Sequence, residues 1–551
     1  MNTAQNLCSM KDASRWASAY LNRAVTPSNI SYLLQYGVIT RHGGNGGPLI
    51  NLEELKQYYN AHDKRHQWKQ KLGDDLNWNL SFAEYQEWER TKHVHRLHPY
   101  KGKFIPQLVA YFLDDHVDEF KRQVCFQPGD IGLDPFCGSG TTLVQANELG
   151  MHAVGVDISA FNAMISNAKV ARYDIPKLAK TAAELTARLD DFQRARNSIH
   201  FEEELLAALA RFNAKHFPSP EYKRQVRQGE INEREYAGKR AEKFSAIYAG
   251  LVTKHGIQIE QAGGDSFLDK WFLHPVREEI DFLFAQLKAV DDSDLKKILA
   301  IMLSRTARTC RATTHADLGT LKEPVTAAYY CKKHGKICKP LFSIGNWWKR
   351  YAADTVKRLR EFDALRTDTH QLCLAGDGAA VDIGHALGER DAKLAGLLAA
   401  QKARGIFSSP PYVGLIDYHE QHAYSYEIFG FSRNDEREIG PLSRGQGKHA
   451  RNDYANGIAA VLRNCKRCLQ PDYDVFLVAN DKFNLYPGIA DNAGMRIVER
   501  YKRPVLNRVE KDRGGAYAEI IFHMKDKQHA RIKSAGLTLR PELDRRFAEF
   551  N

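Results

Sequence analysis

The sequence predicts an α/β protein with a doubly wound, Rossmann-like parallel sheet, a large mainly helical insertion and an N-terminal module similar to a winged helix-turn-helix. Three observations predict this fold. Strand and helix patterns alternate from about residue 131 and again from about residue 371, a charged helical stretch separates the two runs, and short helices flank a glycine-rich segment near the N-terminus. Alternating strands and helices are typical of βαβ units in a parallel sheet.

The sheet is expected in two parts, residues 91–175 and 369–527. The first part contains the strands "IGLDPF" and "HAVGVDI" and the helices "TTLVQANELG" and "SAFNAMISNAKVARY". The second contains the strands "QLCLAG", "GIFSS", "YDVFLVAN" and "AYAEIIFHMK". Residues 176–368 lack this alternation and predict a helical insertion, and residues 528–551 form a polar, basic tail.

Residues 1–60 predict a separate small module. The helices "SRWASAYLNR" and "NISYLLQYG" come first, and Ser28 or Asn29 is expected to cap the second. The glycine-rich "VITRHGGNGGPLI" predicts a hairpin before the helix "NLEELKQYYN". This order resembles a DNA-binding winged helix-turn-helix, although any small helical domain with a loop would also fit. Residues 61–90 predict a linker or arm.

The composition excludes several classes of protein. The chain has 551 residues, of which 43% are hydrophobic, enough for more than one core. It has no apolar run of about 18 residues, so neither a transmembrane helix nor a membrane partner is expected. The first residues lack the apolar segment of a secretion signal, and nine cysteines do not suggest a disulfide scaffold. A cytoplasmic location fits these features.

The positive charge is concentrated in the insertion. The net charge is +12, and between residues 303 and 360 there are 13 Lys and Arg residues against three acidic ones. Such a local field indicates a polyanionic partner, and we expect double-stranded DNA; a solubilising surface is the alternative. The candidate contacts, chiefly to phosphates, are Arg305, Arg308, Arg311, Lys332 and Lys333.

The stretch "LDPFCGSGTT" lies where a strand leads into a helix. Gly138 and Gly140 allow a ligand to approach the backbone closely, and the helix N-terminus offers free N–H groups. Asp157 ends the next strand, where an acid accepts hydrogen bonds from ribose hydroxyls. No Gly-Lys-Ser/Thr ending is present, which disfavours a Walker-type phosphate site. The pattern predicts a pocket for a nucleoside-type cofactor.

A second motif, "GIFSSPPY", follows a later strand. Pro410 and Pro411 fix the backbone and remove two N–H donors. Ser409 adds a hydroxyl acceptor and Tyr412 a flat aromatic face. This combination suits an exocyclic amino group, which would donate its hydrogens to Ser409 and to the Pro410 carbonyl while its base stacks on Tyr412.

Together the two motifs resemble those of S-adenosylmethionine-dependent DNA methyltransferases that modify cytosine N4 or adenine N6. "GVDIS" resembles the ribose motif of this family, "LAGDGA" the motif that contacts the cofactor adenine, and "HPYKGKFIPQL" the segment over the methionine end. The likeness covers roughly residues 90–170 and 370–525. It implies a cofactor site formed by Tyr100, Lys103, Asp134, Pro135, Phe136, Cys137, Gly138, Gly140, Thr141, Thr142, Asp157, Ile158 and Asp377.

The resemblance also implies a reaction. A base would leave the duplex and place its amine beside the cofactor, at Ser409 to Tyr412. The serine form of this tetrapeptide resembles cytosine-N4 enzymes more than adenine-N6 enzymes, so cytosine is favoured. An RNA guanine-N2 methyltransferase and a catalytically silent DNA-binding regulator are alternatives. A cognate restriction endonuclease or another defence component is a candidate partner. Here the cofactor motif precedes the catalytic motif by about 270 residues, whereas many serine-type enzymes have the reverse order, so target recognition is expected in the insertion.

Other cysteines and histidines have weaker interpretations. The reaction needs neither a metal nor a nucleophilic cysteine, so Cys137 is expected to pack beneath the cofactor. In "CKKHGKIC", Cys331, His334 and Cys338 could bind zinc with Cys310 or His315, but a metal-free phosphate loop is favoured. Two further features are Cys465 with Cys468, expected in a helix core, and His419 with His422, expected either near the flipped base or at a helix start.

Overall fold

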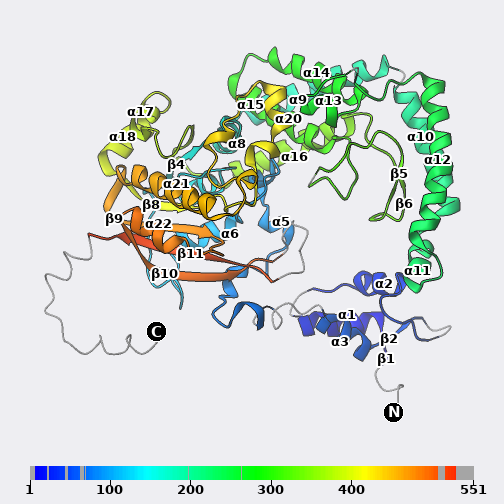
Figure 1. The fold of residues 1–551 in the computed structure, drawn as a ribbon, viewed down its shortest axis with the longest axis horizontal. Helices are drawn as coiled ribbons and strands as arrows, with labels where there is room; N and C mark the ends of the chain where they lie inside the picture. Colours follow the sequence, from blue (N-terminus) through cyan, green and yellow to red (C-terminus); the bar gives the residue numbers. More distant parts are fainter. Residues whose placement is uncertain are drawn as a thin grey trace.

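The computed structural model describes residues 7–21, 24–43, 47–61, 68, 70–196, 198–261, 263–319, 321–506 and 516–528. Of the predicted tail, only residue 528 is described, and residues 529–551 lie outside the described residues. The sheet occupies one side of the molecule, the insertion extends over its top and far side, and the N-terminal module lies beneath the insertion (Figure 1). Among the described helices, none is long and apolar enough to cross a membrane. All nine cysteines are free thiols.

One seven-stranded sheet organises the fold. Its spatial order is β10 (Met495–Pro504), β11 (Ala518–Asp526), β9 (Leu469–Ala479), β8 (Ala403–Ser408), β3 (Ile131–Asp134), β4 (His152–Asp157) and β7 (Gln371–Ala375). The five strands from β9 to β7 are parallel, whereas β11 is antiparallel to both of its neighbours. The expected doubly wound sheet is therefore present, with an antiparallel hairpin at one edge.

The strand order reverses between β3 and β8. From β3 the chain continues outward through β4 to β7, and β8 then returns to the other side of β3. In doubly wound sheets, ligands bind beyond the carboxyl ends of the strands at this reversal. The predicted cofactor motif follows β3 and the predicted catalytic motif follows β8, so the fold brings two distant parts of the chain to one point.

Alternating strand residues build a separate core on each face of the sheet. Val154 and Leu477 lie in one core and Ala153 and Phe476 in the other. The first face is covered by α17 (Ile383–Gly388), α18 (Ala392–Gln401), α21 (Lys448–Lys466) and α22 (Tyr486–Asn492). The opposite face is covered by α6 (Pro106–Leu113), α7 (Thr141–Glu148) and α8 (Ala160–Val170). Cys465 is buried in the α21 core, as expected.

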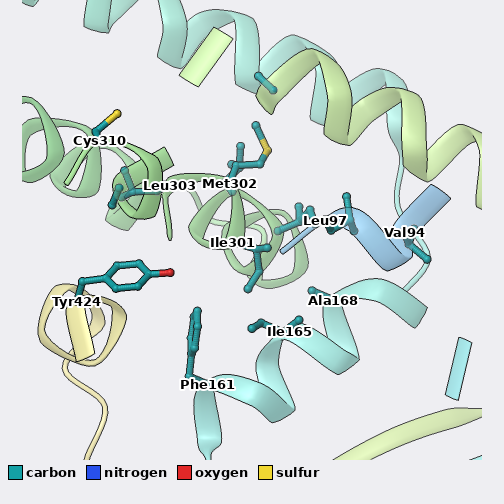
Figure 2. Close-up of a cluster of buried hydrophobic side chains, with 14 of the residues drawn as sticks. Val94, Leu97, Phe161, Ile165, Ala168, Ile301, Met302, Leu303, Cys310 and Tyr424 are labelled. Carbon is teal, nitrogen blue, oxygen red and sulfur yellow. The ribbon is translucent and has the colours of Figure 1, made fainter. Parts of the chain in front are cut away.

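The insertion is helical and shares a core with the sheet. It comprises α9 (Ile175–Arg194), α10 (Ser198–His216), α11 (Glu221–Gln228), α12 (Glu233–His255), α13 (Phe267–Trp271), α14 (His274–Lys288), α15 (Ser293–Thr309), the hairpin β5 (Tyr329–Cys331) and β6 (Lys336–Cys338), and α16 (Gly345–Asp363). In Figure 2, Ile301 and Met302 of α15 lie in one apolar cluster with Ile165 of α8 and Leu97. This continuous core fixes the insertion to the sheet.

The N-terminal module has a small core of its own. It contains β1 (Leu7–Ser9), α1 (Met10–Leu21), α2 (Pro27–Gln35), β2 (Leu49–Asn51) and α3 (Leu52–Ala61). Thr26, not Ser28 or Asn29, caps α2, because Pro27 occupies the first helical position and Thr26 forms a capping box with Asn29. An antiparallel bridge joins His42 to Leu49, at the position of the expected hairpin. Its DNA-binding role stays a prediction.

The segment from residue 76 to residue 90 differs from the expected linker. Leu80 is fully buried and Phe82 nearly so, and both belong to the core beneath the sheet. The Asn77 N–H donates to the Lys502 carbonyl of β10 at 2.7 Å. A short 3-10 turn (Asn79–Ser81) and α5 (Glu87–Arg90) continue this packing. This packing places the segment in the sheet domain. The sequence did not reveal the buried face, because its apolar residues are spaced among polar ones.

Candidate active site

The ends of β3 and β8 are joined directly. The Ser408 hydroxyl donates to the Asp134 carboxylate at 2.5 Å, and the Thr142 hydroxyl donates to the Phe407 carbonyl at 3.3 Å. Asp134 is buried, and this burial raises its pKa to about 6. The first motif is thereby bonded to β8, the strand that ends just before Ser409, which fixes the geometry between the two motifs.

A tight glycine turn follows Asp134. Gly138 and Gly140 adopt φ angles of +52° and +74°, a region that strongly favours glycine. A Cβ on Gly138 would lie 3.1 Å from the Tyr100 ring, so a side chain there would crowd the pocket. Gly140 caps α7, whose N-terminus lies beside the pocket at Thr141. The turn leaves backbone N–H groups close to any ligand.

Helix α8 holds this turn from behind. The Ser166 hydroxyl donates to the Gly138 carbonyl at 3.1 Å, and the Lys169 ammonium donates to the Ser139 carbonyl. Lys169 is fully buried, and its burial lowers its pKa well below the usual value. Sequence reasoning missed both residues, because nothing in the α8 pattern distinguishes them from ordinary helix positions. They pre-organise the loop on which a cofactor would rest.

Asp157 connects the turn to the second strand. Its carboxylate accepts hydrogen bonds from the Gly138 N–H at 2.7 Å, the Ser159 N–H at 2.9 Å and the Asn162 amide at 3.1 Å. A carboxylate has about four acceptor sites, so one remains for a ligand. Burial raises the pKa of Asp157 to about 6. The group is therefore ionised at neutral pH and can accept from a ribose hydroxyl.

One cavity unites the two motifs. It contains about 900 Å³ of empty space, counting the open solvent at its mouth. Ser409 and Pro411 line it together with the glycine turn and Asp157. Of the predicted cofactor residues, those that line the cavity are Tyr100, Lys103, Pro135, Phe136, Cys137, Gly138, Thr141, Asp157, Ile158 and Asp377. Asp134, Gly140 and Thr142 lie just behind this wall and hold it in place.

The segment over the cavity is stacked on a second aromatic segment. Tyr100 lies 5.9 Å from the Tyr418 ring and 5.7 Å from the His422 ring, with nearly parallel planes in both pairs. Lys103 lines the cavity and donates to the His95 carbonyl at 2.7 Å, and burial lowers its pKa to about 8. These contacts close one side of the cavity.

Only part of the predicted catalytic tetrapeptide lines the cavity. Ser409 and Pro411 face the cavity, whereas Pro410 is buried. Tyr412 does not line the cavity, and its hydroxyl donates to Glu519 of β11 at 2.8 Å. This bond anchors the loop to the neighbouring strand. The aromatic ring of Tyr412, expected to stack on the base, therefore does not line the cavity.

One lining residue comes from a segment that sequence reasoning judged ambiguous, and another was not predicted. His419 of α19 (Tyr418–Gln421) and Glu438 both line the cavity, and the Glu438 carboxylate accepts from the His419 backbone N–H at 2.8 Å. Burial raises the pKa of Glu438 to about 7. His422 does not line the cavity but stacks beside it, and its burial lowers its pKa to about 3. Both histidines in "YHEQHAY" therefore belong to the site region.

Cys137 packs within the wall of the cavity. A Cβ on Gly155 would lie 2.5 Å from its sulfur, so the glycine in β4 makes room for this side chain. The thiol is 5% exposed, and burial raises its pKa well above the usual value. A protonated, enclosed thiol is a poor nucleophile, which agrees with the packing role expected for Cys137.

The basic residues predicted to contact DNA occupy different environments. Arg305 is buried, pairs with Asp354 at 2.6 Å and stacks on Tyr351. Arg311 is also buried and donates to the Leu318 carbonyl at 2.7 Å. Neither guanidinium is available as expected. Arg305 lies on an inward-facing position of α15, whereas Arg311 follows the end of that helix and is buried in the next loop. Arg308 is half-buried, and Lys332 and Lys333 are exposed on the turn of the β5–β6 hairpin.

Comparison with known proteins gives the chain a family. A family model described as DNA methylase matches residues 45–167. The Type II methyltransferase M.MjaII of Methanocaldococcus jannaschii is 43% identical over 528 residues, which cover 95% of this chain and 97% of that protein. The Type II methyltransferase M.MvaI of Kocuria varians is 31% identical over 115 residues, 21% of this chain and 24% of that protein.

A solved structure of the rRNA methyltransferase aviRa from Streptomyces viridochromogenes aligns with 80% of this chain and 92% of its own, at 11% identity and a TM-score of 0.26. So low a score carries no argument about either fold or function. The extent and identity of the match to M.MjaII carry the assignment instead. The chain therefore belongs to the amino-methyltransferase family of DNA methylases, among the Type II methyltransferases.

Proposed function

We propose that the protein transfers a methyl group from S-adenosylmethionine to an exocyclic amine of a base in double-stranded DNA, with cytosine N4 as the target. One observation carries this proposal: Ser409 and Pro411 line the same cavity as Gly138, Asp157 and Asp377. A cofactor site and an amine-binding loop thus share one space. The resemblance of the chain to Type II methyltransferases supports the same reaction.

The residues present fit S-adenosylmethionine. The glycine turn and the start of α7 offer N–H groups to the methionine carboxylate, and Asp157 has an acceptor site for a ribose hydroxyl. Asp377 follows β7 and lines the cavity, and in this proposal it contacts the adenine ring. When bound, the cofactor supplies an activated methyl group on a sulfonium. Tyr100 and Phe104 would shield it from water.

The protein's own contribution is orientation and polarisation of the amine. The Ser409 hydroxyl and the Pro410 carbonyl accept the two amine hydrogens. This draws the conjugated lone pair back onto the nitrogen and directs it toward the cofactor. Positioning and fixed dipoles supply most of the rate enhancement in such reactions. The bond from Ser408 to Asp134 keeps Ser409 at a constant distance from the glycine turn.

Cytosine is favoured over adenine because the tetrapeptide begins with serine, and adenine N6 is the alternative target. The DNA partner is supported by the exposed Lys332 and Lys333 and by the N-terminal module. We also propose a cognate restriction endonuclease as a partner, because both curated relatives are Type II methyltransferases. RNA guanine N2 remains the less favoured substrate.

Labelled methyl transfer tests the proposal. The full-length protein is incubated with tritiated S-adenosylmethionine and either duplex DNA or total RNA. We expect label in DNA and none in RNA, and Ser409→Ala is expected to reduce the rate about 100-fold while cofactor binding is retained. Label only in RNA would refute the DNA assignment. Tight DNA binding without transfer to any DNA would favour a silent regulator.

A further inference from the structure

Four metal-binding side chains meet where the β5–β6 hairpin touches the segment after α15. Their ligand atoms, one from each residue, all lie within 4.8 Å of one another. We call this group the hairpin cluster; it consists of His315, Cys331, His334 and Cys338. Three members belong to the "CKKHGKIC" motif, and the fourth, His315, lies sixteen residues before Cys331. No residue of the cluster lies in the cavity described above.

Two distances within the cluster match those of a tetrahedral site. His334 Nδ1 lies 3.5 Å from the Cys331 sulfur and 3.6 Å from the Cys338 sulfur. Zinc–sulfur and zinc–nitrogen bonds of about 2.3 and 2.05 Å at tetrahedral angles place sulfur and nitrogen ligands about 3.6 Å apart. Thiol-to-imidazole hydrogen bonds have similar lengths, and these separations are also those of two ligands on one ion.

The hairpin turn presents its three ligands to one point. The His334 N–H and the Gly335 N–H both donate to the Cys331 carbonyl, at 3.1 and 2.7 Å. Gly335 adopts φ +64°, which lets the chain reverse immediately after His334. Cys331 and Cys338 end opposite strands and are 3% and 8% exposed. The two thiols are therefore enclosed, and His334 closes the turn over them.

His315 is oriented by a neighbouring hydroxyl. The Tyr329 oxygen lies 2.9 Å from His315 Nδ1 and accepts from the His315 backbone N–H at 3.1 Å. With Nδ1 occupied in this way, Nε2 is the nitrogen available to the cluster. Metal-bound histidines usually have such a partner on the second nitrogen, which fixes the ring and its tautomer. The His315 and His334 rings lie 4.5 Å apart.

The donor set identifies the metal. Two thiolates with two imidazoles at tetrahedral spacing are typical of structural zinc, and four protein ligands leave no open position for catalysis. We propose that the hairpin cluster holds a structural zinc ion. The ion fastens the hairpin, whose strands have only three residues each, to the segment that follows α15. Such short two-stranded hairpins are marginally stable without further support.

Other candidate groups among the described residues are less suited to a metal. Cys310, the alternative fourth ligand in the sequence, is outside the cluster. Asp474, in the group with Cys125 and His523, is already bonded to Arg404 and Lys525. Glu148, in the group with His93 and His95, is paired with Lys92. In these two groups, protein cations already neutralise the carboxylate.

Metal analysis of the full-length protein tests the proposal. The protein is purified under reducing conditions, incubated with zinc chloride, freed of unbound metal and analysed by mass spectrometry. We expect about one zinc ion per chain in the wild type and less than about 0.2 in Cys331→Ser and Cys338→Ser. Cys310→Ser and Cys468→Ser are the matched controls and should retain the full amount. Equal zinc in all variants, or none in the wild type, overturns the proposal.

A cobalt spectrum keeps the test independent of whether the variants fold. Wild-type protein loaded with Co²⁺ should show the intense visible bands of tetrahedral coordination and a near-ultraviolet band from thiolate to metal. Weak visible absorption typical of six-coordinate cobalt would contradict the assignment. Neither measurement depends on methyl transfer, so the zinc proposal and the proposed function can fail separately.

Discussion

Asp157 links the backbone of the glycine turn to the expected cofactor ribose. Its carboxylate already accepts three hydrogen bonds from the protein, and Gly138 is one of the donors. Losing its charge would both weaken a ligand hydrogen bond and loosen the turn. Hydrogen bonds to charged groups contribute about 1.5–3 kcal/mol. Asp157 is therefore the residue whose chemistry can be tested with the least change in shape.

Asp157→Asn is expected to weaken S-adenosylmethionine binding about 10- to 100-fold, measured by titration calorimetry. The amide keeps the volume of the side chain but lacks the charge. Asp368→Asn is the control, because its side chain is 99% exposed, and it should bind the cofactor like the wild type. Unchanged affinity in Asp157→Asn would mean that the cofactor does not use this carboxylate.

The pH dependence of cofactor binding should report the same group. Burial raises the pKa of Asp157 to about 6, above the usual value of about 3.9. The carboxyl is thus ionised above pH 6 and gains a proton below it. Cofactor affinity should be flat above about pH 7 and fall toward tenfold per pH unit below about pH 6.

Asp157→Asn, which binds more weakly, should show a shallower fall with pH than the wild type. Asp134 has a similarly raised pKa and would supply the remaining slope. Identical slopes in the wild type and the variant would show that Asp157 is not the titrating group.

At the scale of elements, replacing two different glycines by alanine should change the free energy of unfolding in opposite directions. A Cβ on Gly155 of β4 would lie 2.5 Å from the sulfur of Cys137 and 3.2 Å from that of Cys373. A Cβ on Gly250, exposed in α12, would contact nothing within 4 Å. Gly155→Ala should lower the free energy of unfolding by about 1–3 kcal/mol through overpacking. Gly250→Ala should raise it by about 0.5–1 kcal/mol through helix propensity.

Urea denaturation followed by circular dichroism measures both effects on the same protein. Because the two substitutions add the same methyl group, each serves as the control for the other. Destabilisation by Gly250→Ala, or tolerance of Gly155→Ala, would contradict the packing described around β4.

The elements predicted from sequence are those with strong local patterns. The strands β3, β4, β7, β8, β9 and β11 were all expected, since each contains a short apolar run. In contrast, β10 was missed. Its residues alternate with charges such as Arg496, Glu499 and Lys502, and it lies at the sheet edge, where only its pairing with β11 defines it as a strand. Such non-local pairing leaves little trace in a single sequence.

The candidate site likewise contains residues that local motifs predict and residues that only the tertiary structure reveals. Motif residues such as Gly138 and Ser409 could be proposed from the sequence because their motifs are local, and both line the cavity. Glu438 and Lys169 were missed as site residues because their roles arise from contacts with distant segments. Arg305 was misplaced because spacing of three along a helix defines a face but not its orientation, and Arg311 was misplaced because α15 ends at Thr309, before this residue. Only the packing of α15 against α16 shows that this face is partly buried.

On the scale of the whole molecule, the insertion connects the sheet with the N-terminal module. The Arg227 guanidinium of α11 donates to the Tyr36 carbonyl at the end of α2. The β5–β6 hairpin is held by the neighbouring helix α10, since the Asn213 side chain bonds to both backbone groups of Ile337 at 2.9 Å. The exposed lysines of the hairpin thus sit on a rigid frame, and we propose that they contact DNA phosphates.

The double variant Lys332→Gln/Lys333→Gln should weaken binding of any duplex, with a salt dependence shallower by about two phosphate contacts. Fluorescence anisotropy over a range of salt concentrations measures this slope. Arg390→Gln/Lys393→Gln removes the same charge at exposed positions beside and on α18, far from the hairpin in Figure 1, and should leave the slope unchanged. Equal slopes in both double variants would place the DNA elsewhere.

Identification of the methylated nucleoside tests most directly whether the cavity joins a cofactor site to an amine-binding site. Duplex DNA treated with the protein and S-adenosylmethionine is digested to nucleosides and analysed by mass spectrometry. The predicted product is N4-methyldeoxycytidine, present with the wild type and strongly reduced with Ser409→Ala. N6-methyldeoxyadenosine would retain the mechanism but change the base. Methylation at cytosine C5, or no methylated nucleoside in DNA, would contradict the assignment of Ser409 and its loop to amine methylation.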